Sequence, residues 1–215
     1  MQNTTSLSRE TKMSEGLSTK TLYLAETALM IAVTLIMGNT FLGTIPTPVL
    51  KISIVTVPVA LAAMLIGPTA GIVCGLVFGF NSFITAITGG SGLLSTLFNI
   101  NPVGVFFTAV IARFLDAFIV SNLFTILKKS PLGKASYYIT GLLMPLLNTV
   151  FFMGILCIFF YHTDFVQGLV EQYNATGPFS LVVAMVGIQA TVEAVIGCVL
   201  AGTLGLILSK VLHRA

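Results

Sequence analysis

The chain has 215 residues, of which 56% are hydrophobic and only 8% are charged, whereas soluble domains carry about a quarter charged residues. No soluble fold can hide that much apolar surface, so the composition excludes a soluble globular protein and predicts an integral membrane protein. The net charge is only +3. Because the basic residues lie near the ends of apolar runs and form no cluster with aromatic residues, nucleic acid is not an expected partner.

The first twenty residues are polar and rich in Ser and Thr. They predict a mobile or interfacial tail (1–20) that precedes a membrane domain (21–215). The alternative is a secretory signal made from this tail and the first apolar run. That run contains Glu26 and shows no small-residue cleavage site before Gly38 and Asn39, so we expect it to be a membrane span instead.

Apolar runs of spanning length recur along the rest of the chain, and a spanning helix needs about 20 such residues. They predict an all-α membrane protein, a bundle of six transmembrane helices over residues 22–38, 52–66, 70–87, 102–128, 137–161 and 179–211. Gly67 and Pro68 leave room only for a tight turn between the second and third helices. The longer connecting segments, which we expect to be loops, are 39–50, 88–101 and 162–178.

Basic residues are distributed unevenly between the two sides of this six-span arrangement. One side carries Arg9, Lys12, Lys20, Lys128, Lys129, Lys134, Lys210 and Arg214, and the other carries only Lys51. Because Lys and Arg near span ends are retained in the cytoplasm, both termini are predicted to be cytoplasmic. The long connecting segments then face outward, which places the function at the outer mouth of the bundle.

Four ionisable residues lie inside the predicted spans: Glu26, Arg113, Asp116 and Glu193. Each costs several kcal/mol in hydrocarbon unless it faces protein or water, so each is a candidate for function. Arg113 stands roughly 16 Å into its helix, near mid-membrane, where a planar guanidinium can bind a carboxylate through two parallel hydrogen bonds. The alternative is an internal ion pair with Asp116, three residues further on, or with Glu193.

Uncharged polar residues fall at a comparable depth in other spans. Asn81, Asn148 and Gln189, together with Glu193, are predicted to converge with Arg113 on a substrate. The alternative is that these amides hold helices together by hydrogen bonds across the bundle. Two further candidates, Asn99 and Asn101, directly precede Pro102 and act either as binding residues or as loop caps.

Small residues recur at four-residue spacing on three spans, and such seams let helices approach closely. They are Ala28 and Ala32 on the first span, Gly71, Gly75 and Gly79 on the third, and Gly197, Ala201 and Gly205 on the sixth. For the third and sixth spans we expect packing within the bundle. For the first span, a protein partner is the alternative.

The chain carries none of the G-x-x-x-x-G-K-[S/T], H-E-x-x-H or G-x-S-x-G motifs. Its two histidines, His162 and His213, lie at a span end and in the tail, and its three cysteines are far apart. We therefore expect no catalytic residues, no metal site and no cofactor in this chain. The energy for any uptake must come from elsewhere.

Four segments of the chain together carry a family resemblance. They are LGTIPTP (42–48), IGPTAGIVCGLVFGFNSFITA (66–86), FNINPVGVFFTAVIAR (98–113) and LLNTVFFMGIL (146–156). With these segments the chain resembles the substrate-binding S-components of energy-coupling factor (ECF) vitamin transporters, most closely the pantothenate-type members. The likeness extends over nearly all six spans.

The resemblance implies a multi-pass protein of the prokaryotic cell membrane that binds one vitamin from outside, in a pocket closed by the first and third outer loops. It also implies docking on a transmembrane coupling protein driven by two ATPases, which use the ATP and Mg. Arg113 matches a pantothenate-contacting arginine, and Asn148 matches the asparagine of an N-T pair. Ala28 and Ala32 match a docking seam. Relatives often carry proline where this chain has Ala112, so a straighter fourth span is expected.

Other functions remain open on the sequence alone. One alternative is an S-component for another small vitamin. A second is a proton- or sodium-coupled secondary carrier, in which Arg113, Asp116 and Glu193 form the coupling site. A third, an intramembrane enzyme, is weakened by the absence of recognisable catalytic pairs.

Overall fold

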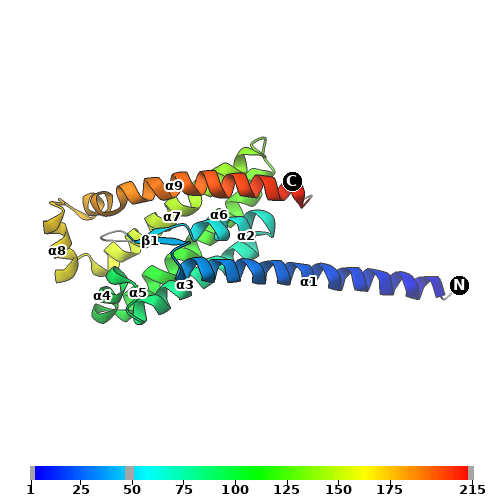
Figure 1. Cartoon of the computed structure of the whole chain (residues 1–215), viewed down its shortest axis with the longest axis horizontal. Coiled ribbons are helices and arrows are strands. Elements are labelled where there is room, and N and C mark those ends of the chain that lie inside the picture. Colours follow the sequence, from blue (N-terminus) through cyan, green and yellow to red (C-terminus); the bar gives the residue numbers. More distant parts are fainter. Residues whose placement is uncertain (1–2, 47–50, 213–215) are drawn as a thin grey trace.

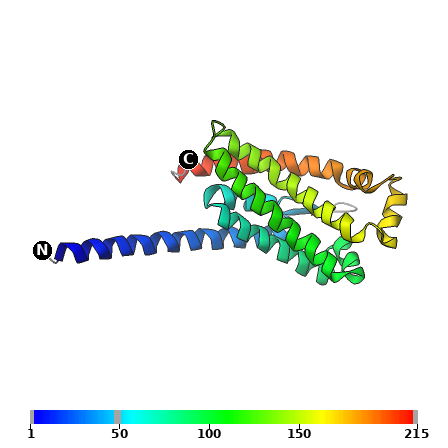
Figure 2. The same ribbon diagram turned by 180° about the vertical axis from the view of Figure 1, so that it is seen from behind.

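The computed structural model describes residues 3–46 and 51–212, and side chains within 19–43 and 53–212. Its helices are α1 (Asn3–Asn39), α2 (Thr56–Leu65), α3 (Pro68–Ile87), α4 (Gly92–Ile100), α5 (Pro102–Phe106), the π-helical turn η1 (Phe107–Ile111), α6 (Ala112–Lys128), α7 (Ala135–Phe160), α8 (Asp164–Gln172) and α9 (Pro178–Val211). The longer helices run roughly side by side, and α1 projects beyond the others (Figures 1 and 2).

Within the described residues, five helices are long and apolar enough to cross a membrane. They cover Thr19–Asn39, Pro68–Ile87, Pro102–Lys128, Ala135–Phe160 and Pro178–Val211. These helices coincide, within a few residues, with five of the six predicted spans. The all-α class is therefore confirmed, whereas the count of six spanning helices is not.

The predicted helix over 52–66 is wrong in extent. Residues 51–53 form strand β2 (Lys51–Ser53), which pairs antiparallel with β1 (Thr44–Pro46). The helix α2 that follows has ten residues, or about 15 Å, roughly half the thickness of the hydrocarbon layer. All ten are buried, and most of them belong to an apolar cluster that includes residues of α3, α6, α7 and α9. This run is apolar because protein surrounds it, so its hydropathy does not require it to span lipid.

The polar tail is helical where the structure describes it. The backbone of α1 begins at Asn3 and continues into the first span, so this part is not an irregular segment. The boundary at residue 20 and the cytoplasmic location stay predictions. Among the residues used for those predictions, the side chains of Arg9, Lys12, Lys51 and Arg214 lie outside the described part, as do His213 and positions 47–48 of the LGTIPTP segment.

Two of the predicted loops contain short helices. The segment 88–101 holds α4, which buries Leu93, Leu94 and Leu97. The segment 162–178 holds α8, which buries Val166. Each helix places its apolar side chains on one face, and both belong to the same cluster as the C-terminal half of α7. The two connections are thus built into the bundle.

The turn between α2 and α3 has the tight form expected from Gly67-Pro68. Gly67 adopts a φ of 140°, which is open to glycine and strained for other residues. The small-residue seams of α3 and α9 are also as expected, because they pack inside the bundle. A Cβ on Gly75 would collide with Ala117 of α6, and one on Gly197 would collide with the Gly141 carbonyl of α7.

The closest contact with another helix backbone along the α3 seam, at Gly79, gives a stability prediction. A Cβ on Gly79 would lie 2.9 Å from Val110 Cα and 3.0 Å from the Ala109 oxygen, so Gly79→Ala must separate two backbones. We expect it to lower the free energy of unfolding by about 2 kcal/mol, as measured by thermal unfolding in detergent. Gly154→Ala is the matched control: it has open space around it, and we expect no loss or a gain of about 0.5–1 kcal/mol. Equal changes in the free energy of unfolding for the two variants would contradict the close packing at Gly79.

Candidate functional site

The fourth span contains a π turn directly before Arg113. The backbone N–H of Ala112 donates to the carbonyl of Phe107, five residues back, and a proline at this position would lack that donor. The absence of proline therefore does not produce the straighter, regular helix expected from the sequence. A π turn widens the helix and frees carbonyl groups from the regular hydrogen-bond pattern of the α-helix, and such turns are frequent at functional sites.

Arg113 uses the carbonyl groups of this widened turn. Its Nη1 donates to the Ala109 oxygen at 3.0 Å and more weakly to the Thr108 oxygen at 3.5 Å. The guanidinium carbon also lies 4.4 Å from the ring centre of Phe78 and 5.2 Å from that of Phe152. These contacts hold the charge against two aromatic faces. The side chain is only 8% exposed, and its Nε has no hydrogen-bond partner.

A small cavity of about 80 Å³ adjoins Arg113. Four of the predicted site residues line it: Arg113 from α6, Asn148 from α7, and Gln189 and Glu193 from α9. The remaining lining residues are Ser53, Thr149, Phe152, Met153 and Val186. The structure therefore brings together the guanidinium, an amide from each of two other helices, and a carboxylate. Asn148 is buried, and its Oδ1 has no hydrogen-bond partner, which leaves it available to a ligand donor.

Glu193 connects α9 to the strand β2. Its Oε1 accepts a hydrogen bond from the Ser53 backbone N–H at 2.6 Å and another from Gln189 Nε2 at 3.1 Å. The carboxylate is only 4% exposed, so these two donors satisfy a buried charge. Ser53 thus forms one wall of the cavity and is held there by an intramembrane carboxylate.

Asp116 is buried one turn beyond Arg113 and does not line the cavity. Its Oδ1 has no hydrogen-bond partner. No ion pair is found between Arg113 and either Asp116 or Glu193 among the described residues, so the internal pair drawn from the sequence as the alternative stays a prediction.

Three predicted binding residues lie elsewhere. Asn81 Oδ1 accepts a hydrogen bond from Asn39 Nδ2 at 2.8 Å, which joins α3 to the end of α1. Asn101 Oδ1 accepts from the Gly104 N–H at 3.1 Å and caps α5, as its alternative reading proposed. Asn99 is exposed on α4. None of these three asparagines lines the Arg113 cavity.

Several residues that contact Arg113 or line its cavity were not among the predicted site residues. Phe78 and Phe152 lie in two of the quoted segments, but an aromatic residue in an apolar span carries no signal of its own. Thr149 is the second member of the N-T pair and was open to prediction. Ser53 follows the connection 39–50, and its contact with Glu193, 140 positions away, has no local signature in the sequence.

The predicted docking seam lies on the side of α1 that faces away from the bundle. Ala28 and Ala32 are exposed, as are the neighbouring Leu29 and Ile36. Thr34, on the opposite side of the helix, is only 1% exposed. The seam is therefore accessible to lipid or to a second protein.

Together, several long apolar helices and a buried polar cavity define a multi-pass membrane protein with a candidate ligand site. Residues 22–205 match the family of ECF transporter substrate-specific components, and the chain belongs to this family. No curated protein matches it significantly. Membership makes the chain a substrate-binding subunit of a transporter and not a catalytic one, and it implies association with components of an ECF module.

Proposed function

We propose that this S-component captures pantothenate from outside the cell at the Arg113 cavity. The observation that carries the proposal is a buried guanidinium facing Asn148 and Gln189 across one cavity. Pantothenate offers a carboxylate for the guanidinium and an amide and hydroxyl groups for the two amides, which matches this set of donors and acceptors. An S-component for another small vitamin is the alternative.

The bound vitamin would pass through an ECF module made of a transmembrane coupling protein and two ATPases. In this proposal the module hydrolyses ATP with Mg, and the chain itself binds no cofactor. The domain 21–215 crosses a prokaryotic cell membrane six times, with α2 and the β1–β2 hairpin together completing the second crossing. The basic residues then place both termini in the cytoplasm.

The cavity must enlarge to accept a vitamin. Its volume of about 80 Å³ is well below the roughly 300–1,000 Å³ of sites that enclose small organic ligands. Of its walls, α6, α7 and α9 are long helices, and α6 and α9 both pack against α7, whereas β2 is a three-residue strand. The smallest rearrangement that enlarges the cavity is therefore an outward movement of β2, with loss of the Ser53–Glu193 hydrogen bond.

A binding titration of the purified chain against a panel of water-soluble vitamins tests the proposed substrate. We expect saturable, tight binding of pantothenate and much weaker binding of uncharged vitamins, because Arg113 gains its full interaction only with an anion. If another vitamin binds more tightly, that compound and not pantothenate is the substrate. Uptake that persists in cells without the ATPase subunits and collapses with the proton gradient would overturn transport through an ECF module.

The exposed seam on α1 gives a prediction that separates docking from binding. Ala28→Leu adds bulk to the outward face of α1, so we expect pantothenate binding within about twofold of the parent and uptake in cells reduced at least about tenfold. Ala184→Leu, at an exposed position of α9, makes the same change as a control and should leave both unchanged. Normal uptake by Ala28→Leu would show that this face is not the docking seam.

A further inference from the structure

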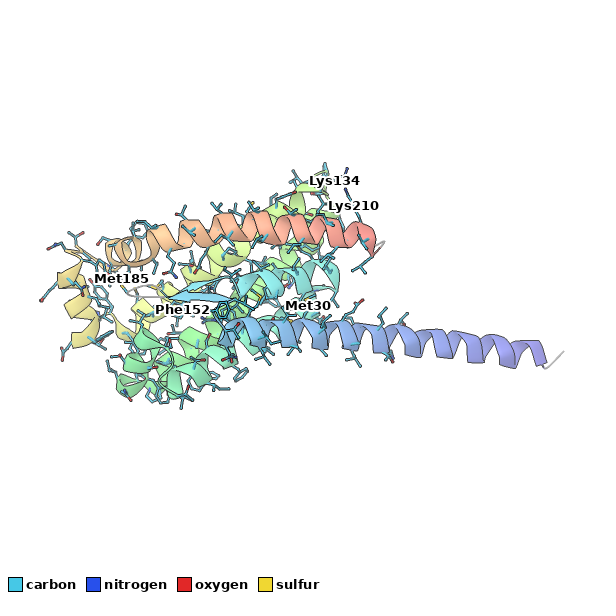
Figure 3. All side chains as sticks on the ribbon, viewed as in Figure 1. Met30, Lys134, Phe152, Met185 and Lys210 are labelled. Atoms are coloured by element: carbon cyan, nitrogen blue, oxygen red, sulfur yellow. The ribbon has the colours of Figure 1, made fainter. Side chains whose placement is uncertain are left out.

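A groove separate from the Arg113 cavity lies between α1, the α2–α3 turn and the end of α6. Its volume is about 720 Å³, large enough for part of a lipid-sized molecule. It is located at the same end of the bundle as the end of α9 (Figures 1 and 2). Lys134 and Lys210 also lie at this end (Figure 3), which the distribution of basic residues predicts to be cytoplasmic.

The groove combines an apolar floor with a basic rim. Leu22 of α1 and Phe124 of α6 are among its apolar lining residues, whereas Lys128 and Lys129 lie at the end of α6. Glu26 also lines it, so the two lysines leave a net positive charge. A second hollow of about 370 Å³ shares Thr19 and Tyr23 with this groove and adds Lys20 to the same region.

We propose that this groove binds one anionic phospholipid of the cytoplasmic leaflet, with an acyl chain against Leu22 and Phe124 and the phosphate at Lys128 and Lys129. Basic pockets between transmembrane helices on the cytoplasmic side are suited to anionic headgroups, and lysines at a helix end reach the headgroup level readily. On α6 the lining changes from Phe124 within the span to Lys128 and Lys129 at its end, which follows the order of a phospholipid from acyl chain to phosphate, whereas on α1 Glu26 lies one turn further from the basic end than Leu22.

The position of the groove favours a lipid over a protein helix as its occupant. Tyr23 and Glu26 line it from the side of α1 that faces the bundle. Ala28 and Ala32 lie on the outward side and remain exposed. An occupant of the groove therefore sits between α1 and the bundle, where a single acyl chain fits without covering the seam.

Native mass spectrometry of the full chain, released from bilayers with equal phosphatidylglycerol and phosphatidylcholine, tests the proposal. We expect phosphatidylglycerol to be retained roughly tenfold over phosphatidylcholine, and Lys129→Glu to abolish this preference. Lys134→Glu makes the same charge change at the same end, outside the groove, and should preserve it. Leu22→Trp fills the apolar part and should reduce retention of phosphatidylglycerol at least about fivefold, whereas Leu29→Trp, elsewhere on α1, should not.

Three results would overturn the lipid site. The first is equal retention of the two lipids by the parent chain, and the second is an equal loss of the preference for phosphatidylglycerol in Lys129→Glu and Lys134→Glu. The third is unchanged lipid retention in Leu22→Trp together with failure of this variant to assemble with the coupling protein. The last result would assign the groove to a protein. Pantothenate binding, measured on the same samples, should be unchanged in all four variants, so failure of the lipid site and failure of the proposed vitamin site are distinguishable.

Discussion

Arg113→Ala is expected to lower the affinity for pantothenate at least about a hundredfold in the binding titration. Among the residues whose side chains the structure describes, Arg113 supplies the only basic group that lines the cavity. Hydrogen bonds to a charged partner contribute about 1.5–3 kcal/mol each, where 1.4 kcal/mol is a factor of ten. Arg113→Lys keeps the charge but loses the planar fork. We expect it to recover only part of the affinity.

Two controls separate binding from folding in this experiment. Asn81→Ala removes a polar side chain that lies outside the cavity and bonds to Asn39, so its affinity should stay within about threefold of the parent. Thermal unfolding of Arg113→Ala should show that the bundle persists. If a folded Arg113→Ala protein binds pantothenate normally, the arginine is a structural partner of Asp116 and Glu193, and the proposed substrate contact is wrong.

Linking β2 to α9 is expected to abolish vitamin binding. Ser53→Cys and Gln189→Cys place two thiols, on β2 and on α9, at residues that line the cavity. A short reducible crosslinker between them would hold the cavity near its present volume of about 80 Å³. Since a vitamin needs several times that space, the crosslinked protein should bind at least about a hundredfold more weakly. Reduction of the linker should restore the affinity of the double variant before crosslinking, which itself lacks the Gln189 amide.

The controls for this experiment are the two single-cysteine variants treated with the same reagent. They retain the native thiols Cys74, Cys157 and Cys198, so any effect of the reagent on those residues appears in them as well. Full affinity in the crosslinked double variant would mean that another wall of the cavity moves. The proposed role of β2 as the mobile wall would then fail.

The long helices were predictable because lipid imposes a length and a composition on each one. That rule does not apply to α2, whose ten residues are apolar because other helices enclose them. Hydropathy alone does not distinguish a segment surrounded by lipid from one surrounded by protein. The β1–β2 pairing was likewise not foreseen, since three-residue strands in a loop leave no periodic pattern.

Within the candidate site, the energetic cost of intramembrane charge pointed correctly to Arg113 and Glu193 as residues that face a shared interior. It was harder to predict which amide side chains line the site. Asn148 and Asn81 lie at similar depths, yet only Asn148 lines the cavity, because the face of the helix and not the depth decides the contact. The aromatic partners of Arg113 could not be distinguished from other phenylalanines in apolar spans.

The π turn at Phe107–Ile111 has a consequence for how tightly the site can hold an anion. Because two main-chain oxygens and two aromatic rings already restrain the guanidinium, a ligand does not have to order a long, flexible side chain when it arrives. Ordering such a side chain costs roughly 0.5–1.5 kcal/mol. Preorganisation by the helix backbone therefore leaves more of the interaction energy for affinity, and its benefit should appear in slow release of the ligand.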